Sequence, residues 1–276
     1  MSRKRLTEVF PQLAPLRRKE KTYFFYWKMK HDSNVYSKIQ QQDDLPVELF
    51  KTACPMYNHD TGFDMKYQEN KVFNLKLAAA KLDGLLIRPY ETFSFFKTIK
   101  GADEETPYKD GLTVINGKLT TAPGGGMCQL SNLLFWAFLH TPLNVTERHG
   151  HAVKDFPEPD SDAVKGVDAT VAEGWLDLKA RNDSSDVYQI RIEFTDTDII
   201  CRILCSSDEG YRYGVANCNL NYVSENHRIY EQVDVLQTRY LNGHPENAYR
   251  RVLYRNTCEI GYPLPEGTAV MQGGLL

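Results

Sequence analysis

The chain of 276 residues has no long apolar segment. No run of about eighteen apolar residues occurs, which is roughly the length that a membrane-spanning helix needs. The basic opening, residues 1–5, is not followed by the apolar core of a secretory signal peptide. We therefore expect a cytoplasmic protein. Its apolar fraction of 42% and charged fraction of 25% are typical of a globular chain with a substantial core.

The chain also has few cysteines and little excess charge. Six cysteines scattered over this length do not form a disulfide scaffold, and we expect reduced thiols. The formal net charge of −3 does not favour a nucleic-acid binder. The spacing of Cys201, Cys205 and Cys218 differs from the paired ligands of structural zinc. We therefore expect no metal, no cofactor and no nucleic-acid partner.

Basic residues gather near the N-terminus. The first thirty residues hold nine Lys or Arg against Glu8 and Glu20, and an aromatic segment follows at residues 24–27. One interpretation is a solvated basic arm that leads into a buried aromatic segment. The other is contact with an anionic membrane face. In either case, residues 1–50 are expected to be an arm with short helices.

Helical patterns come early in the chain. Asn70 is a suitable N-cap for a helix that continues to about Asp83 and ends at Gly84. Short strands are expected at 91–95 and 112–115, and Asn116-Gly117 is a strong signal for a two-residue hairpin.

The second half of the chain alternates with period two. Strands are predicted at 167–172, 176–181, 188–194 and 199–203, the last three as an antiparallel meander. A loop at 206–227 and strands at 228–240 and 248–258 complete the pattern. Helices early and strands late predict an α+β fold with a cysteine-bearing helix packed on an antiparallel sheet. We expect an arm at 1–50, a central domain at 51–205 and a β-containing extension at 206–276.

The glycine run 124–126 leads to a lone cysteine, Cys128. The apolar residues that follow have the spacing of a core-facing helix: Leu130, Leu133, Leu134, Ala137 and Phe138. The N–H groups at a helix start stabilise a thiolate, and glycine permits the tight turn that leads there. Cys128 is thus a candidate nucleophile; the alternative is a small buried cysteine in a glycine-rich connection.

Two histidines are candidate bases for this thiol. His149 and His151 share one face if they lie on a strand, so spacing alone does not separate them. We favour His151, because it leads into the apolar pair at 152–153, with His149 at the edge as a supporting residue. Asp168 is a candidate to orient the imidazole, or else a surface carboxylate.

Gln129 and Ser131, which follow Cys128 in the helix, complete the candidate site. The backbone N–H of Gln129, with that of Cys128, is a candidate oxyanion donor at the helix start. Ser131 and Asn132 fit equally well as ordinary polar residues of the first turn. The glycines are not a phosphate loop, since no Lys followed by Ser or Thr comes after them.

Together these segments resemble the VanW domain family. The resemblance rests on residues 93–95, 124–131, 148–151 and 168–171, and it extends over most of the chain, most specifically 57–182. The resemblance implies an association with glycopeptide resistance and cell-wall metabolism. Some multidomain members are linked to L,D-transpeptidation of peptidoglycan through the cysteine of the glycine motif.

Carried over to this chain, the resemblance makes Cys128 the nucleophile that forms a thioester with a donor stem peptide. His151 matches the histidine of the family motif, and Gly125 and Gly126 belong to its glycine run. The implied partner is a peptidoglycan stem peptide or precursor. A non-catalytic protein that binds the precursor or a resistance enzyme is the alternative.

Overall fold

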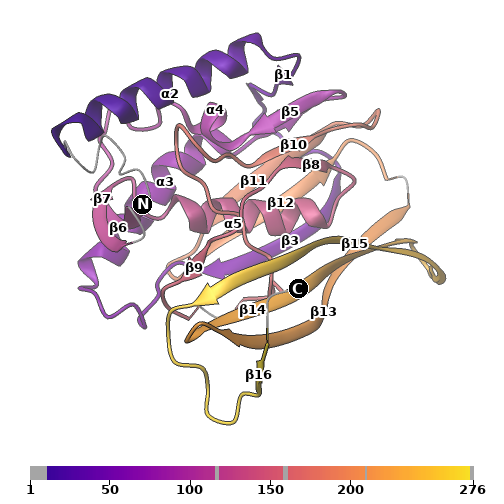
Figure 1. The fold of residues 1–276 in the computed structure, drawn as a ribbon. Helices are drawn as coiled ribbons and strands as arrows, with labels where there is room; N and C mark the ends of the chain where they lie inside the picture. Colours follow the sequence, from indigo (N-terminus) through magenta and orange to yellow (C-terminus); the bar gives the residue numbers. More distant parts are fainter. Residues whose placement is uncertain (1–10, 116–117, 158–160, 209, 274–276) are drawn as a thin grey trace.

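The computed structural model describes residues 11–115, 118–157, 161–208 and 210–273. All of the described helices lie before residue 140: a short 3-10 turn η1 (Pro11–Leu13), then α2 (Ala14–His31), α3 (Lys66–Leu82), α4 (Phe95–Ile99) and α5 (Met127–Leu139). Strands dominate the rest (Figure 1). This arrangement confirms the predicted α+β class.

The strands of the N-terminal half are β1 (Val35–Tyr36), β2 (Ile39–Gln40), β3 (Val47–Pro55), β4 (Leu85–Ile87), β5 (Glu91–Ser94), β6 (Asp110–Ile115) and β7 (Lys118–Pro123). Those that follow α5 are β8 (Asn144–Glu147), β9 (Val153–Lys154), β10 (Lys179–Arg181), β11 (Tyr188–Phe194), β12 (Asp198–Cys205), β13 (Tyr211–Glu225), β14 (Arg228–Leu241), β15 (His244–Ile260) and β16 (Val270–Gln272).

The core lies between α5 and an antiparallel sheet in the order β2-β4-β11-β12-β3. The predicted antiparallel meander is confirmed for β11 and β12, which pair with each other, but it is wrong for β10, which pairs with β5 and β8 in another sheet. Alternate residues of β12, Ile199, Cys201 and Ile203, are fully buried. The apolar stripe of α5 is buried as predicted, with Leu130 and Leu134 at 0% exposure. A helix that buries one full face on a sheet is held firmly, so its first turn is a rigid support for Cys128.

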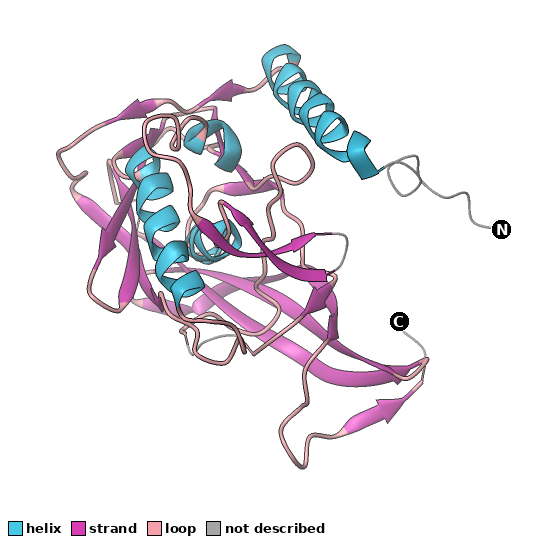
Figure 2. Cartoon of the chain, turned by 90° about the vertical axis from the view of Figure 1, so that its left-hand side faces the viewer, coloured by secondary structure: helices cyan, strands magenta, loops and turns pink. Residues whose placement is uncertain are grey.

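A second sheet, β1-β5-β10-β8, lies beside the first. The C-terminal half adds a third sheet of long strands in the order β16-β13-β14-β15-β9, which extends away from the helices in Figures 1 and 2. The prediction of a loop at 206–227 is wrong, because β13 occupies most of it. This strand is polar, with Asn at 217, 219 and 221, and it is held by pairing with β14 along its length, so it has no apolar alternation.

The start of α3 also differs from the prediction. The helix begins at Lys66, where the Asp64 carboxylate accepts the Lys66 N–H at 2.9 Å, and Asn70 lies inside the first turns. The Asn70 side chain instead donates to the Asp110 carbonyl at 2.8 Å. This contact helps to hold α3 against β6, which makes Asn70 a tertiary contact rather than a helix cap.

Residues 167–171 do not form the predicted strand. Beyond one isolated bridge, Ala172 to Leu176, regular pairing resumes only at β10. Asp168 is 1% exposed, and its neighbours Val167 and Ala169 are buried as well. Apolar and polar residues alternate here in the sequence, but both kinds are buried. The backbone of this segment is bonded to side chains of α5 rather than to a neighbouring strand.

Between residues 11 and 50 the structure has one long helix, α2 of 18 residues, after the short turn η1, and then the strands β1, β2 and the start of β3, in place of the expected short helices. The aromatic residues of α2 lie on opposite faces: Phe25 packs toward the core, whereas Phe24 is 49% exposed and Trp27 46%. The expectation of a buried aromatic segment is therefore wrong for half of it. The basic residues 3–5 and the predicted turn Asn116-Gly117 lie outside the described residues; β6 and β7, on either side of that turn, pair antiparallel.

Within the described ranges, no helix has both the length and the apolarity to cross a membrane.

Candidate functional site

The glycine run turns sharply into α5. Gly124 and Gly126 have φ of +81° and +105°, a backbone conformation that favours glycine, and Gly126 is the residue on which α5 begins. Cys128 is therefore the second residue of the helix, as the sequence predicted. Gly125 has a different constraint, since a Cβ there would lie 2.3 Å from the carbonyl carbon of Gly111 in β6.

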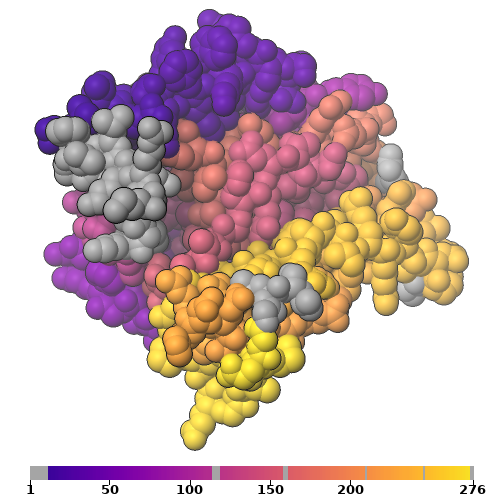
Figure 3. All heavy atoms as spheres, viewed as in Figure 1, coloured from indigo at the N-terminus to yellow at the C-terminus, as the bar shows by residue number. Residues whose placement is uncertain are grey.

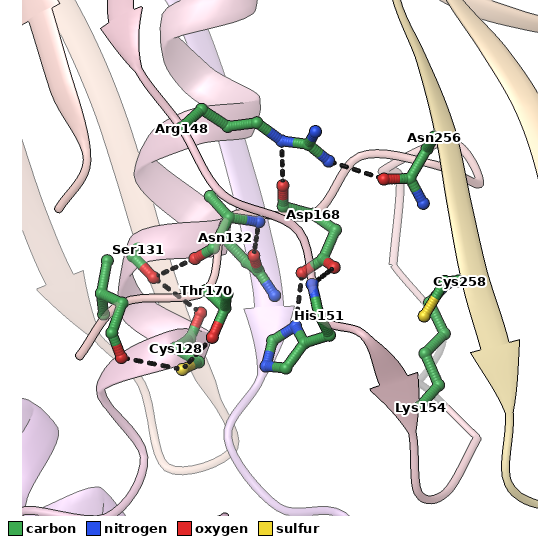
Figure 4. Close-up of polar contacts among 12 residues, drawn as sticks. Cys128, Ser131, Asn132, Arg148, His151, Lys154, Asp168, Thr170, Asn256 and Cys258 are labelled. Atoms are coloured by element: carbon green, nitrogen blue, oxygen red, sulfur yellow. Dashed lines mark hydrogen bonds and ion pairs between the residues drawn. The ribbon is translucent and has the colours of Figure 1, made fainter. Parts of the chain in front are cut away.

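The structure brings Cys128, His151 and Asp168 together (Figure 4). His151 Nδ1 lies 2.6 Å from Asp168 Oδ1, and the His151 backbone N–H donates to the other carboxylate oxygen. The second ring nitrogen is on the side of the Cys128 sulfur, and the imidazole is near enough to lower the pKa of the thiol. The order of contacts is thiol, imidazole, carboxylate, as in a nucleophile, base and orienting acid.

The electrostatics of this trio favour an ion pair. Burial raises the pKa of the Cys128 thiol, but hydrogen bonding and the positive charge of His151 outweigh it, so the pKa is lowered. Burial lowers the pKa of His151, whereas the contacts with Asp168 and Cys128 raise it to about 10. Burial also raises the pKa of Asp168, yet hydrogen bonding to His151 keeps it below its usual value. These directions favour a thiolate beside an imidazolium over the neutral pair.

Residues of α5 hold the Asp168 segment directly over the thiol. The Asn132 side-chain oxygen accepts the Ala169 N–H, and Ser131 Oγ donates to the Ala169 carbonyl. Ser131 is fully buried, so it is more than an ordinary polar residue of the first turn. The Thr170 hydroxyl lies 3.4 Å from the Cys128 sulfur and is suited to donate to a thiolate. Thr170 was missed as a site residue, because no sequence spacing links it to Cys128. Asn132, one helical turn after Cys128, is likewise more than an ordinary polar residue of the helix, since it holds the Ala169 N–H.

Arg148 joins this segment to the C-terminal sheet. Its Nε donates to the Asp168 carbonyl at 2.6 Å, and its second guanidinium nitrogen donates to Asn256 of β15 at 2.8 Å. The guanidinium also stacks over the Tyr254 ring at 4.2 Å. The long β15 strand therefore takes part in positioning Asp168, a role that the sequence did not indicate.

His149 points elsewhere. Its Nε2 lies 3.1 Å from Glu147 Oε1, and the Glu147 carboxylate also pairs with Lys179 at 2.8 Å. The choice between the two histidines, which spacing left open, is thus decided by geometry: His151 meets the thiol and His149 belongs to a separate charge network.

Gln129 departs from its expected role. Its backbone N–H donates to the Gly126 carbonyl at 2.9 Å, so it is not free to hold an oxyanion in this arrangement. Its side chain donates to the Pro55 carbonyl at 2.6 Å and ties α5 to the end of β3. The N–H of Cys128 has no hydrogen-bond acceptor within the described part of the chain, and it remains the helix-start donor nearest the sulfur.

Cys128 and His151 line an extended cleft of ≈ 2920 Å³ that also borders α2, the end of β3 and residues 153–157. Lys71 of α3 lines the same cleft, with its aliphatic stem against Gly126. Burial lowers the pKa of Lys71 to about 8, and none of the described carboxylates forms an ion pair with it. Sequence reasoning missed Lys71, since one lysine in an exposed-looking helix carries no signal.

Within the described residues, no group of three His, Cys, Asp or Glu side chains is placed to hold a metal ion.

Fold and site define an α+β protein with a helix-start thiol beside a half-buried histidine that a buried aspartate orients. A family model described as "VanW like protein" matches residues 70–204, which contain all three residues. The chain is 53% identical over 272 residues, 99% of both chains, to "Vancomycin B-type resistance protein VanW" of Enterococcus faecalis. This chain belongs to the VanW family.

A more distant relative covers only part of the chain. The "Uncharacterized protein YoaR" of Bacillus subtilis is 30% identical over 160 residues, which are 58% of this chain and 50% of that protein. No solved structure matches the chain.

Proposed function

We propose that this protein is an accessory protein of vancomycin resistance and that it acts on peptidoglycan peptides or their precursors by cysteine acyl transfer of the L,D-transpeptidase kind. The observation that carries the mechanism is the placement of His151: Asp168 holds one ring nitrogen, and the other is on the side of the Cys128 sulfur. The name of the 53% identical relative supports the resistance role.

In the first step, the Cys128 thiolate attacks the carbonyl carbon of a peptide bond in the donor stem. The oxyanion that forms is held by the N–H of Cys128 at the start of α5. Collapse of this adduct breaks the C–N bond, and the His151 imidazolium gives its proton to the departing amine. A thioester between Cys128 and the donor acyl group remains.

In the second step, an acceptor amine or water attacks the thioester, and neutral His151 takes its proton. The C–S bond then breaks, the acyl group is transferred to the acceptor, and the thiolate with its imidazolium is restored. Asp168 keeps the imidazole oriented through both steps, which its burial and the contacts of Arg148 and Asn132 support.

This mechanism is tested by incubating the purified protein with stem peptides and precursor and analysing it by mass spectrometry. We expect an acyl adduct on Cys128 and crosslinked, exchanged or hydrolysed peptide products. Cys128→Ala is expected to form neither, whereas Cys218→Ala, which replaces a half-buried thiol on β13, is expected to match the wild type. Products formed equally by Cys128→Ala would contradict the mechanism. Peptide binding without adduct or product would make the protein a non-catalytic binding module.

Lys71 is expected to hold a carboxylate of the peptide in the cleft, because it is a desolvated amine with its stem fixed against Gly126. Lys71→Met preserves the stem and removes the charge. We expect KM for a stem peptide with a free C-terminus to rise by about 10- to 100-fold, the range of a hydrogen bond to a charged group. The kinetics of wild type and variant are compared on the free and the C-terminally amidated peptide.

The effect should disappear with the amidated peptide. Lys81→Met, on the exposed face of the same helix, is the matched control and should leave KM unchanged. An equal KM of wild type and Lys71→Met for the free peptide would exclude this role.

A further inference from the structure

Helix α2 carries an apolar stripe on its outer face. Leu16, Tyr23, Phe24 and Trp27 are 66%, 65%, 49% and 46% exposed and fall at helical spacing. The opposite face packs on the body of the protein, with Met29 at 4% exposure and the Tyr26 hydroxyl donating to Glu173 at 2.8 Å. The stripe is therefore not the side that the fold buries. In Figure 3 the helix lies along the upper edge of the molecule.

Basic residues flank this stripe on both sides. Arg17, Lys21 and Lys28 follow one edge at helical spacing, and Lys19 and Lys30 follow the other. With Arg18 the helix has six Lys or Arg and a single acidic residue, Glu20, in a chain whose net charge is −3. Arg17 pairs with Glu20, whereas the other exposed basic residues of α2 have no ion pair with a described carboxylate. Helix α2 is thus strongly basic around its aromatic stripe.

We propose that α2 docks the protein on an anionic lipid surface. Aromatic rings settle at the level of lipid headgroups, and Lys and Arg on both sides of them meet the phosphates of a plane that extends to either side. Basic residues on both sides of the stripe favour a lipid plane, because an anionic plane meets positive charge at either edge of the aromatic rings.

This docking would bring the cleft to the membrane surface. Leu16, Arg17 and Lys21 of α2 also line the cleft that contains Cys128. The docking itself does not depend on the proposed acyl transfer, since it rests on the exposed face of α2 alone.

The test is flotation of the full chain with vesicles of phosphatidylcholine alone and of phosphatidylcholine with an equal part of phosphatidylglycerol. We expect the protein to float with the anionic vesicles only, and less so as salt is raised. Phe24→Ser/Trp27→Ser should weaken binding about 10-fold or more through lost apolar contact. Lys19→Gln/Lys30→Gln should weaken it about 30-fold, on the basis of two surface charges.

The matched control is Tyr249→Ser, which removes an aromatic side chain of 66% exposure from β15 and should bind like the wild type. Folding of each variant is checked by circular dichroism. The proposal fails if the wild type does not float, if neutral vesicles bind equally, or if the α2 variants bind as the wild type does. It also fails if sedimentation shows a dimer that Phe24→Ser/Trp27→Ser dissociates without any lipid binding, since a second copy would then cover the stripe.

Discussion

Replacing His151 with Asn is expected to slow alkylation of Cys128 by iodoacetamide at pH 6.5 by about 30-fold or more. In the wild type the imidazolium outweighs the burial that raises the pKa of the thiol, so the pKa is lowered and more of the sulfur is thiolate than in an ordinary cysteine. Without the imidazolium, burial keeps the pKa of the thiol at its ordinary value of about 8.5 or above. Such a thiol is only about 1% ionised at pH 6.5. The lower intrinsic nucleophilicity of the low-pKa thiolate offsets a part of this difference.

The dependence of the Cys128 alkylation rate on pH shows whether His151 lowers the pKa of the thiol. Because the wild-type thiol pKa is lowered, its alkylation rate should persist to a lower pH than that of His151→Asn before protonation of the thiolate reduces it. In His151→Asn the rate should fall about tenfold for each unit of pH below the raised pKa. The measurement is time-resolved peptide mass spectrometry of Cys128, with Cys54, whose pKa burial raises, as the slow internal reference.

His149→Asn is the matched control for this experiment. It removes an imidazole two residues away that contacts Glu147 instead of the thiol, so the alkylation rate should equal that of the wild type. If His149→Asn and His151→Asn slowed the reaction equally, or if neither did, the assignment of His151 as the partner of the thiol would be wrong.

Gly125→Ala is expected to lower the free energy of unfolding by about 3 kcal/mol, the upper part of the usual range for overpacking. The new Cβ would lie 2.3 Å from the Gly111 carbonyl carbon and 2.5 Å from its oxygen, and backbone atoms cannot move aside as a side-chain end can. For a chain of this size the melting temperature should fall by roughly 6–12 °C. Thermal unfolding followed by circular dichroism measures both.

Gly214→Ala provides the control. Gly214 lies on β13 with no heavy atom within 4 Å of the added Cβ, and its φ is not positive. This variant therefore measures the effect of a glycine-to-alanine change without a steric clash. We expect a change within about 0.5 kcal/mol, as for surface substitutions in general. Equal melting temperatures for wild type and Gly125→Ala would show that β6 and the glycine run can separate at little cost.

Much of the fold follows from local pattern. The stripe of α5 and the alternation of β11 and β12 were predicted, since both record directly which face of an element meets the core. Strand β13 was missed because it is held by backbone hydrogen bonds to β14 rather than by a buried apolar face. Backbone pairing of this kind leaves no apolar periodicity in the sequence. The helix cap expected at Asn70 is likewise a tertiary contact with β6.

The candidate site also has features that follow from local sequence and features that depend on tertiary contacts. The sequence by itself determined that Cys128 stands at the start of a core-packed helix, because glycines and an apolar stripe are local signals. Only the tertiary structure decided that His151 and not His149 meets the sulfur, that Asp168 is buried behind it, and that the Gln129 N–H is already bonded. These outcomes depend on contacts between segments far apart in the chain, such as Arg148 with β15. Such contacts cannot be predicted from the residue pattern within a single segment.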